Sequence, residues 1–227
     1  MNILHMPQMT SQRWAVLWLA LGVACSSQRS QAITTITVYS SSAAKPWLES
    51  AYACVPQSSA IKLSDDPSAD AVLRLGEPET LTLPTYQIGI DDLLVVTHPR
   101  TGIGPLTVSQ VQALFAGQFV NWSEVGGADL PVQVWVFDPS ADVQTVFDRA
   151  VMYGRPITSL ARLAVSAQHM SDSVGSVDGS IGVLPRRWKT GNVHEALLFA
   201  SSPVLMLVSQ EPRGDLAALI ACMQTRE

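Results

Sequence analysis

Short alternating runs of apolar residues, each followed by a polar turn and a helical pattern, recur along the chain from residue 33 onward. The alternation predicts strands over residues 33–39, 70–75, 131–137, 179–185 and 203–209, and a strand pair or one long strand over 86–98. Apolar positions at helical spacing predict helices over 46–54, 108–115, 143–153, 168–174 and 215–224. Strands that alternate with helices indicate an α/β fold on a mainly parallel sheet.

Local signals mark several helix ends independently of the apolar pattern. Pro46 stands where the first helix begins, and proline is favoured in the first helical turn. Thr107 is an expected N-cap for the helix that follows it, because its hydroxyl can accept a backbone hydrogen bond. Gly117 follows the end of that helix, as a glycine at a helix C-terminus commonly does.

Two polar turns follow predicted strands and precede predicted helices. They are Ser40–Ser42, after the first strand, and Asp138–Asp142, after the strand over 131–137. Ligands of open α/β sheets bind beyond the carboxyl ends of the strands. Helix starts also present backbone N–H groups without partners, which favour negative charge. Both turns are therefore candidate anion sites.

The N-terminal segment predicts export. Arg13 precedes an apolar stretch, residues 14–24, which suits a signal peptide and is too short to span a bilayer. The ending LGVAC resembles a bacterial lipobox, although Gly22 replaces its usual leucine. We expect residues 1–25 to be a lipoprotein-type signal ending at a lipidated Cys25, with ordinary secretion as the alternative. Residues 26–32 then form a flexible tether.

Composition narrows the function classes. Hydrophobic residues make up 47% and charged residues 15%, which favours a well-filled core over disorder. The net charge of −5 argues against a nucleic-acid partner. The four histidines have no metal-ligand spacing, and neither a G-x-S-x-G motif nor a P-loop is present. We expect no enzyme activity, no metal and no cofactor.

Two cysteines, Cys54 and Cys222, remain after Cys25 is assigned to lipidation. An exported protein folds in an oxidising compartment, where the two could form a disulfide. Two buried thiols are the alternative, and the sequence leaves it open because it does not give their separation.

The segment over residues 106–127 resembles the phosphate-binding-protein-like (PstS-type) branch of periplasmic solute-binding proteins. It reads LTVSQVQALFAGQFVNWSEVGG and matches that family in its LT, LF, G, NW, EV and GG positions. The resemblance implies a two-lobed periplasmic-binding-protein type II fold with two crossover strands. Lobe 1 would comprise residues 33–90 plus 195–227, and lobe 2 residues 91–194. Ligand would bind in the cleft between them.

In that family an oxyanion such as phosphate is held by backbone N–H groups, Ser and Thr hydroxyls at helix starts, and an Arg. The resemblance therefore implies a site made from the two polar turns and the helix start after the second. The candidate residues are Ser40, Ser41, Ser42, Ser140, Ala141, Asp142 and Thr145. The serines of the first turn could also simply cap the following helix.

The second turn departs from the family pattern. Ser140-Ala141-Asp142 stands where Ser-Gly-Thr is usual, and the preceding Arg is absent. Asp142 would repel an anion, or accept a hydrogen bond from the hydroxyl of a protonated oxyanion; we favour a simple helix-capping role for it. Arg74, or else the Arg186-Arg187 pair, could replace the missing basic group, although each is also a natural surface charge.

Together these observations predict an exported, monomeric solute-binding protein of the cell envelope. It would capture a small anion such as phosphate and deliver it to an ABC permease, with its lipid anchor in the membrane. The alternative is an accessory or sensory envelope protein that keeps the fold but has lost phosphate binding. The ligand and its affinity do not follow from the sequence.

Overall fold

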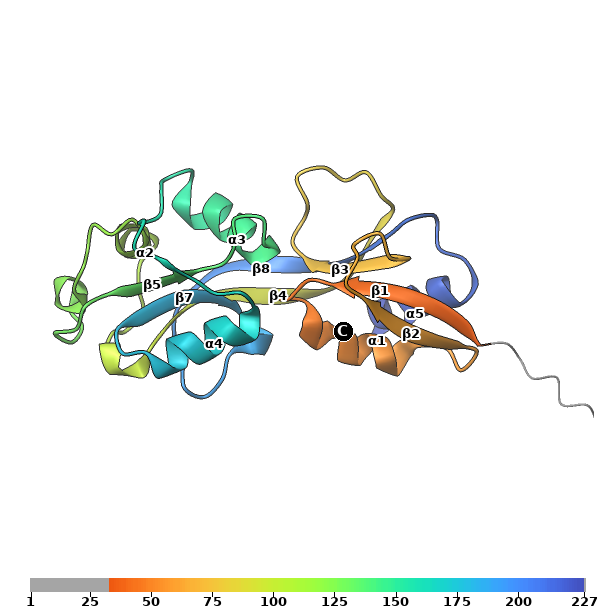
Figure 1. The fold of residues 1–227 in the computed structure, drawn as a ribbon, viewed down its shortest axis with the longest axis horizontal. Helices are drawn as coiled ribbons and strands as arrows, with labels where there is room; N and C mark the ends of the chain where they lie inside the picture. The colour runs from red at the N-terminus through yellow and green to blue at the C-terminus, as the bar shows by residue number, and fades with distance from the viewer. Residues whose placement is uncertain (1–32, 227) are drawn as a thin grey trace, which may run out of the picture. The chain divides into compact units, whose positions relative to one another are not determined.

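The computed structural model describes residues 33–226, so the predicted signal peptide, Cys25 and the tether lie outside the described residues. One eight-stranded sheet runs through this part of the chain, in the order β2-β1-β3-β8-β4-β7-β5-β6 (Figure 1). Its strands are β1 (Thr34–Ser40), β2 (Ser59–Ser64), β3 (Ala71–Leu75), β4 (Thr85–Thr97), β5 (Gln133–Val136), β6 (Arg162–Leu163), β7 (Ser180–Pro185) and β8 (His194–Val208). The α-helices are α1 (Leu48–Cys54), α2 (Val108–Phe115), α3 (Asp142–Phe147), α4 (Ala167–Ser176) and α5 (Gly214–Thr225).

Strands β4 and β8 are the two crossover strands that the resemblance implied. They pair antiparallel along nearly their whole length, from Thr85↔Leu207 to Thr97↔His194, at the centre of the sheet. β1 pairs in parallel with β2 and β3 on one side of them, and β5 pairs in parallel with β6 and β7 on the other. The expected mainly parallel sheet is therefore wrong in detail: the sheet is mixed, because β4 and β8 run antiparallel to their neighbours.

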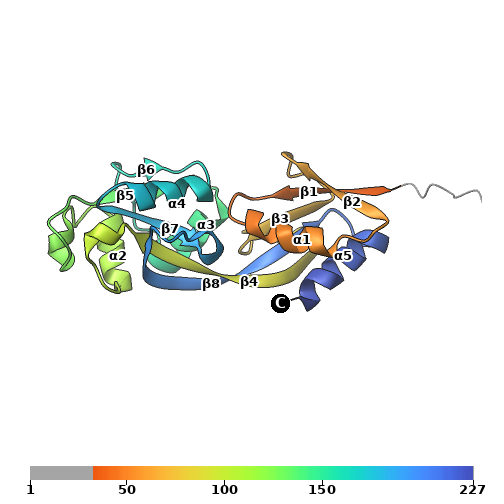
Figure 2. The ribbon, with the colours of Figure 1, turned by 90° about the horizontal axis from the view of Figure 1, so that it is seen from below.

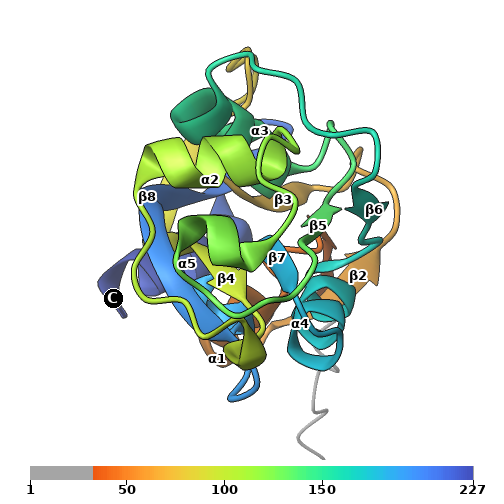
Figure 3. The same ribbon diagram turned by 90° about the vertical axis from the view of Figure 1, so that its left-hand side faces the viewer.

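The helices divide between the two ends of the sheet. Figure 2 shows α1 and α5 beside β1–β3, and α2, α3 and α4 beside β5 and β7. In the second lobe α2 and α4 lie on opposite sides of β7, so both faces of the sheet are covered (Figures 2 and 3). We keep the predicted lobe boundaries, near residues 90 and 195, as a proposal, since β4 and β8 run continuously through both lobes.

In β3 the burial alternates along the strand. Ala71, Leu73 and Leu75 are fully buried, whereas Val72 and Arg74 are only partly buried. Successive side chains of a strand point to opposite faces, so this pattern places Arg74 on the less covered face of lobe 1.

The sequence patterns missed β6, which is two residues long, and two longer stretches of strand. β2, Ser59–Ser64, lies in a segment for which no element was expected, because SAIKLS lacks a clean apolar alternation. The predicted strand over 203–209 is the second half of β8, which begins at His194. Its first half is held by its pairing with β4 rather than by its own pattern.

The segment that carries the family resemblance builds the frame of the second lobe. Thr107 forms the predicted N-cap, as part of a capping box with Gln110. The indole of Trp122 is fully buried and donates to the Gly179 carbonyl at 2.8 Å, so this residue packs inside the lobe. At Gly127 any Cβ would lie 2.7 Å from the Thr101 carbonyl oxygen, so the backbone there requires glycine. The residues of this segment that match the family therefore determine how the second lobe packs.

A disulfide joins Cys54 at the end of α1 to Cys222 in α5, which resolves the alternative that the sequence left open. The two cysteines are 168 positions apart, so the bond closes a loop that contains most of the described chain. A cross-link of this kind removes conformational entropy mainly from the unfolded state.

Reducing this disulfide should lower the free energy of unfolding by about 2–4 kcal/mol, because the unfolded chain regains the entropy of a long loop. Denaturant titrations with and without reductant measure the difference. The Cys54→Ser/Cys222→Ser variant is the control, and its midpoint should not respond to reductant. Equal midpoints for the oxidised and reduced wild type would contradict the prediction.

Candidate functional site

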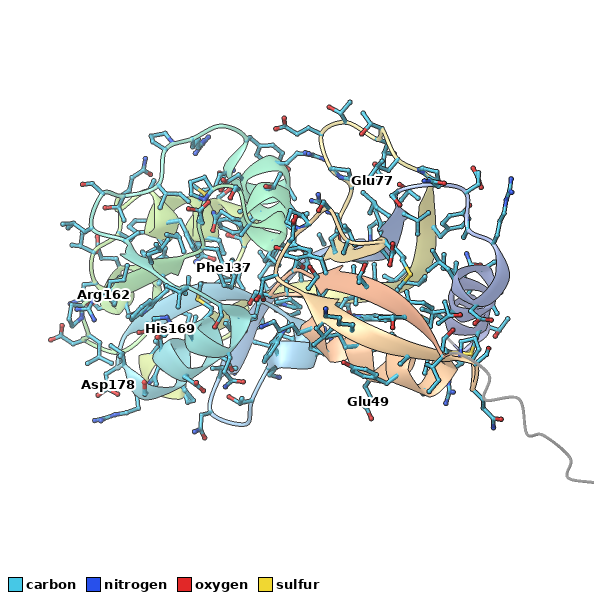
Figure 4. All side chains as sticks on the ribbon, turned by 45° about the vertical axis from the view of Figure 1, so that its right-hand side comes forward. Glu49, Glu77, Phe137, Arg162, His169 and Asp178 are labelled. Carbon is cyan, nitrogen blue, oxygen red and sulfur yellow. A yellow bond between two sulfur atoms is a disulfide. The ribbon has the colours of Figure 1, made fainter. Side chains whose placement is uncertain are left out.

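A cavity of about 360 Å³ opens between the turn after β1, strand β3 and the turn before α3. Six of the eight predicted site residues line it: Ser41, Ser42, Arg74, Ser140, Ala141 and Asp142. In Figure 4, Phe137 marks the second-lobe segment that leads into this turn, and Glu77 marks the loop after β3 in the first lobe. The two polar turns identified in the sequence thus meet at one cavity.

Asp142 connects the two sides of this cavity. Its Oδ2 accepts hydrogen bonds from the Ser41 hydroxyl at 2.6 Å and from the Leu75 backbone N–H at 2.9 Å. Its Oδ1 accepts from the Val143 backbone N–H at 2.9 Å, and only 8% of the residue is exposed. The Asp142 carboxylate, in the second lobe, therefore accepts hydrogen bonds from two groups of the first lobe.

This arrangement corrects the expected role of Asp142. The N-cap of α3 is Ala141, whose side chain makes no capping bond, and Asp142 is the first helical residue. From that position its carboxylate reaches across to lobe 1 instead of capping its own helix alone.

The local backbone makes this approach possible. The pairing of β1 with β3 ends at Ser40↔Leu73, so β1 offers no acceptor to the Leu75 N–H. The bond to β8 on the other side is made by the Gly76 N–H, which donates to the Pro203 carbonyl. Gly76 has a φ of +71°, and a Cβ there would lie 2.8 Å from a methyl carbon of Val146 in α3. Glycine at this position lets α3 approach the end of β3.

The other predicted hydroxyls also have partners within the protein. Ser42 Oγ accepts from the Ala167 N–H at the start of α4, at 2.9 Å, a second link between the lobes. Ser140 Oγ donates to Asp138 at 2.6 Å. Two residues lie outside the cavity lining: Ser40, whose hydroxyl donates to the Ser41 carbonyl, and Thr145, whose hydroxyl donates to the Ala141 carbonyl.

Arg74 is the cationic side chain of the cavity. Its Nε is buried and has no hydrogen-bond partner, and among the described residues no carboxylate pairs with its guanidinium. A buried donor without a partner costs free energy of desolvation, so a ligand that accepts a hydrogen bond from it binds more tightly by removing this cost. The other predicted basic residues lie elsewhere: Arg186 pairs with Asp92 and Glu195, and Arg187 stacks on Trp47.

The charge around the cavity is mixed. Hydrogen bonds from the Ser140 hydroxyl and, next, its backbone N–H hold the pKa of Asp138 below its usual value, so this exposed carboxylate is ionised at neutral pH. Asp138 and Asp142 thus place two carboxyl groups around Arg74. A ligand with both an anionic group and hydrogen-bond donors suits this surface better than a bare anion does.

A family model described as a PBP superfamily domain matches residues 63–197, more than half of the chain. The chain belongs to the PBP superfamily. The matched segment contains β3, β4, α3, α4 and the first part of β8, so it includes the second-lobe side of the cavity.

Solved structures share the fold of this PBP superfamily member at low sequence identity. A phosphate ABC transporter substrate-binding protein from Clostridium perfringens, solved with bound phosphate, is 16% identical with a TM-score of 0.76, over 84% of this chain and 93% of that one. A phosphate transport receptor from Vibrio cholerae is 18% identical with a TM-score of 0.62, over 84% and 94%. A variant of the OxyR2 regulatory domain from Vibrio vulnificus is 10% identical with a TM-score of 0.63, over 87% and 100%. Transport and regulatory proteins alike use this fold.

Within 33–226 no helix is long and apolar enough to cross a membrane. In the same range no group of three or more His, Cys, Asp or Glu side chains is arranged to hold a metal ion.

Sequence reasoning missed the backbone donors of the site. The N–H groups of Leu75 and Ala167 make two of the contacts between the lobes, and a backbone N–H leaves no mark in a sequence. It also missed Trp188, whose indole N–H donates to the Ala43 carbonyl at 2.9 Å and adds a third link.

The crossover strand β4 carries a second buried carboxylate, outside the lining of the cavity. Asp91 is 4% exposed; it accepts from the Trp47 indole at 3.3 Å, and the Arg187 guanidinium lies 3.9 Å away. Burial outweighs these partners and raises the pKa of Asp91. The adjacent Asp92 has the opposite shift, because hydrogen bonds from Ser201 and then Arg186 lower its pKa.

The two neighbours should therefore respond oppositely to pH. Because the folded pKa of Asp91 lies above its unfolded value, the folded state takes up a proton first, and wild type gains stability as the pH falls through that pKa. Relative to wild type, Asp91→Asn should therefore be most stable at neutral pH. This advantage should shrink as the pH falls toward 3.8, the ordinary pKa of an aspartate. Denaturant titrations across this range measure the change.

Asp92→Asn is the matched control with the opposite sign. The folded pKa of Asp92 lies below its unfolded value, so its stabilising contribution is present at neutral pH and is lost as the pH falls through the folded pKa. The relative deficit of this variant should shrink on acidification. Stability profiles of the two variants that stay parallel to wild type would refute both assignments.

Proposed function

We propose that this chain is an exported solute-binding protein that holds a small ligand, through an anionic group, in the cleft between its lobes. Membership of the PBP superfamily supports a binding role, and the proposal includes no catalytic step and no cofactor. The observation that carries it is the buried, unpartnered Nε of Arg74 at a cavity between the lobes. A guanidinium in that state suits a carboxylate or phosphate group, which accepts two parallel hydrogen bonds.

Phosphate is the first ligand to test. Two relatives of the same fold are described as phosphate transport proteins, and by extension we propose delivery to an ABC permease. The carboxylates of Asp138 and Asp142 favour a protonated oxyanion over a fully ionised one, because a ligand hydroxyl can donate to them. The proposed ligand residues remain those of the two turns together with Arg74.

One observation favours a second candidate function. Asp142 already accepts from Ser41 and Leu75, so two first-lobe donors are taken by the protein itself. An accessory or sensory envelope protein that keeps the fold without binding phosphate would have this property. Its partner would be a protein, and its lobes would have no need to open.

For the location, we propose the cell envelope, with a lipid anchor at Cys25 and a monomeric state. The Cys54–Cys222 disulfide supports an oxidising compartment, since such bonds are rare in the cytosol. Because a regulatory domain shares the fold, the fold alone does not determine the location, which has to be tested on this chain.

Isothermal titration with phosphate, sulfate, molybdate and tungstate tests the binding proposal. At least one oxyanion should bind, and Arg74→Ala should weaken it about tenfold or more, because a charge-assisted hydrogen bond is lost. Arg155→Ala is the matched control, since Arg155 is exposed and outside the cavity lining. The absence of heat for every oxyanion would favour the accessory alternative, and unchanged affinity in Arg74→Ala would exclude Arg74 as the anion partner.

Cell fractionation tests the proposed anchor. Full-length protein should sediment with membranes, whereas Cys25→Ala should appear in the soluble envelope fraction, because stable attachment needs the lipid. Cys54→Ser/Cys222→Ser is the control for general loss of a cysteine and should still sediment. A Cys25→Ala protein that remains with membranes would disprove lipid anchoring at this residue.

A further inference from the structure

The contacts of Asp142 are those of a bound anion. A hydroxyl and a backbone N–H of the first lobe converge on Oδ2, while a backbone N–H of the second lobe serves Oδ1. The direction of the Ser41 bond is set by its surroundings. Ser41 Oγ accepts from the Ala44 N–H at 3.3 Å, so its own proton is directed to the carboxylate.

These donors belong to the end of the sheet where an α/β protein binds ligands. Ser41 follows the carboxyl end of β1, and Leu75 is the last residue of β3. Beyond the last β1–β3 pair, the Leu75 N–H would otherwise have no partner in the sheet. The carboxylate that satisfies it comes from 67 positions further along the chain.

We propose that Asp142 is an internal anion, which occupies an oxyanion site of the first lobe and holds the two lobes together without a ligand. The inference rests on the proposed function in that it concerns the same cleft and specifies its chemistry. Ser41 and Leu75 are not available to a ligand while Asp142 is in place. A ligand anion is then directed to Arg74, whose Nε is the unpaired donor there.

The same geometry defines a latent site for a small carboxylate. Replacing Asp142 by alanine removes the carboxylate and leaves the Ser41 hydroxyl and the N–H groups of Leu75 and Val143 without their shared acceptor. A free formate ion presents the same two oxygens as the lost side chain. Formate should therefore bind the variant and restore the stability that the substitution removes, because a ligand specific to the folded state stabilises it by mass action.

Thermal denaturation with sodium formate, against sodium chloride at the same ionic strength, tests this inference. The melting temperature of Asp142→Ala should lie below that of wild type and should rise with formate by more than that of wild type, in which Arg74 is the anion partner left open. Adding Ser41→Ala to the variant should weaken formate binding about tenfold, through the loss of one charge-assisted hydrogen bond. If Asp142→Ala does not fold, Asp142→Ser is the substitute, because serine also vacates most of the space of the carboxylate. Its melting temperature should rise with formate in the same way.

Asp138→Ala is the matched control. Asp138 borders the same cavity, but its carboxylate accepts only from the hydroxyl and N–H of Ser140 on its own exposed turn. Its variant should respond to formate no more than wild type does. Equal responses of Asp142→Ala and wild type, or formate binding that is indifferent to Ser41, would overturn the inference. Neither outcome depends on whether the wild-type cleft binds phosphate, so the two proposals fail separately.

Discussion

The closed arrangement of this cleft depends on the hydrogen bonds that Asp142 accepts from the opposite lobe. A buried carboxylate needs strong donors, and hydrogen bonds to a charged group each contribute about 1.5–3 kcal/mol. Here two of those donors, Ser41 and Leu75, lie in the opposite lobe. Burial of the Asp142 carboxylate and closure of the lobes are therefore coupled. The free-energy cost of burying the charge is compensated only when the lobes are closed and the donors are in place.

The rest of the fold brings these groups together. The long antiparallel pair β4 and β8 joins the lobes, and the segment over 106–127 contributes buried side chains to the core of the second lobe. Two more links, from Ala167 to Ser42 and from Trp188 to Ala43, support the same closed arrangement. In solute-binding proteins of this fold a ligand is expected to bridge the lobes; in this chain side chains and backbone already do so.

Local signals predicted most of the fold, and non-local contacts account for what they missed. Thr107, Gly117 and most of the alternating strands placed their elements to within a few residues, because each signal acts over one or two turns of chain. The exception is β8, which begins nine residues before the predicted strand, at His194. The sequence also located the two turns that meet at the cavity. It could not reveal that Asp142 accepts from Leu75, since that partner is a backbone group 67 positions away.

Hydrogen exchange at the Leu75 amide, followed by NMR without added ligand, is the decisive test of whether Asp142 holds the two lobes together. This N–H donates to Asp142 and is not paired with β1, so its protection reports on the contact between the lobes. If Asp142 holds the lobes together, exchange should be slow in the unliganded wild type and much faster in Asp142→Ala, with the Leu73 region of β3 unchanged. Rapid exchange at Leu75 in wild type, as expected for an open cleft, would contradict it.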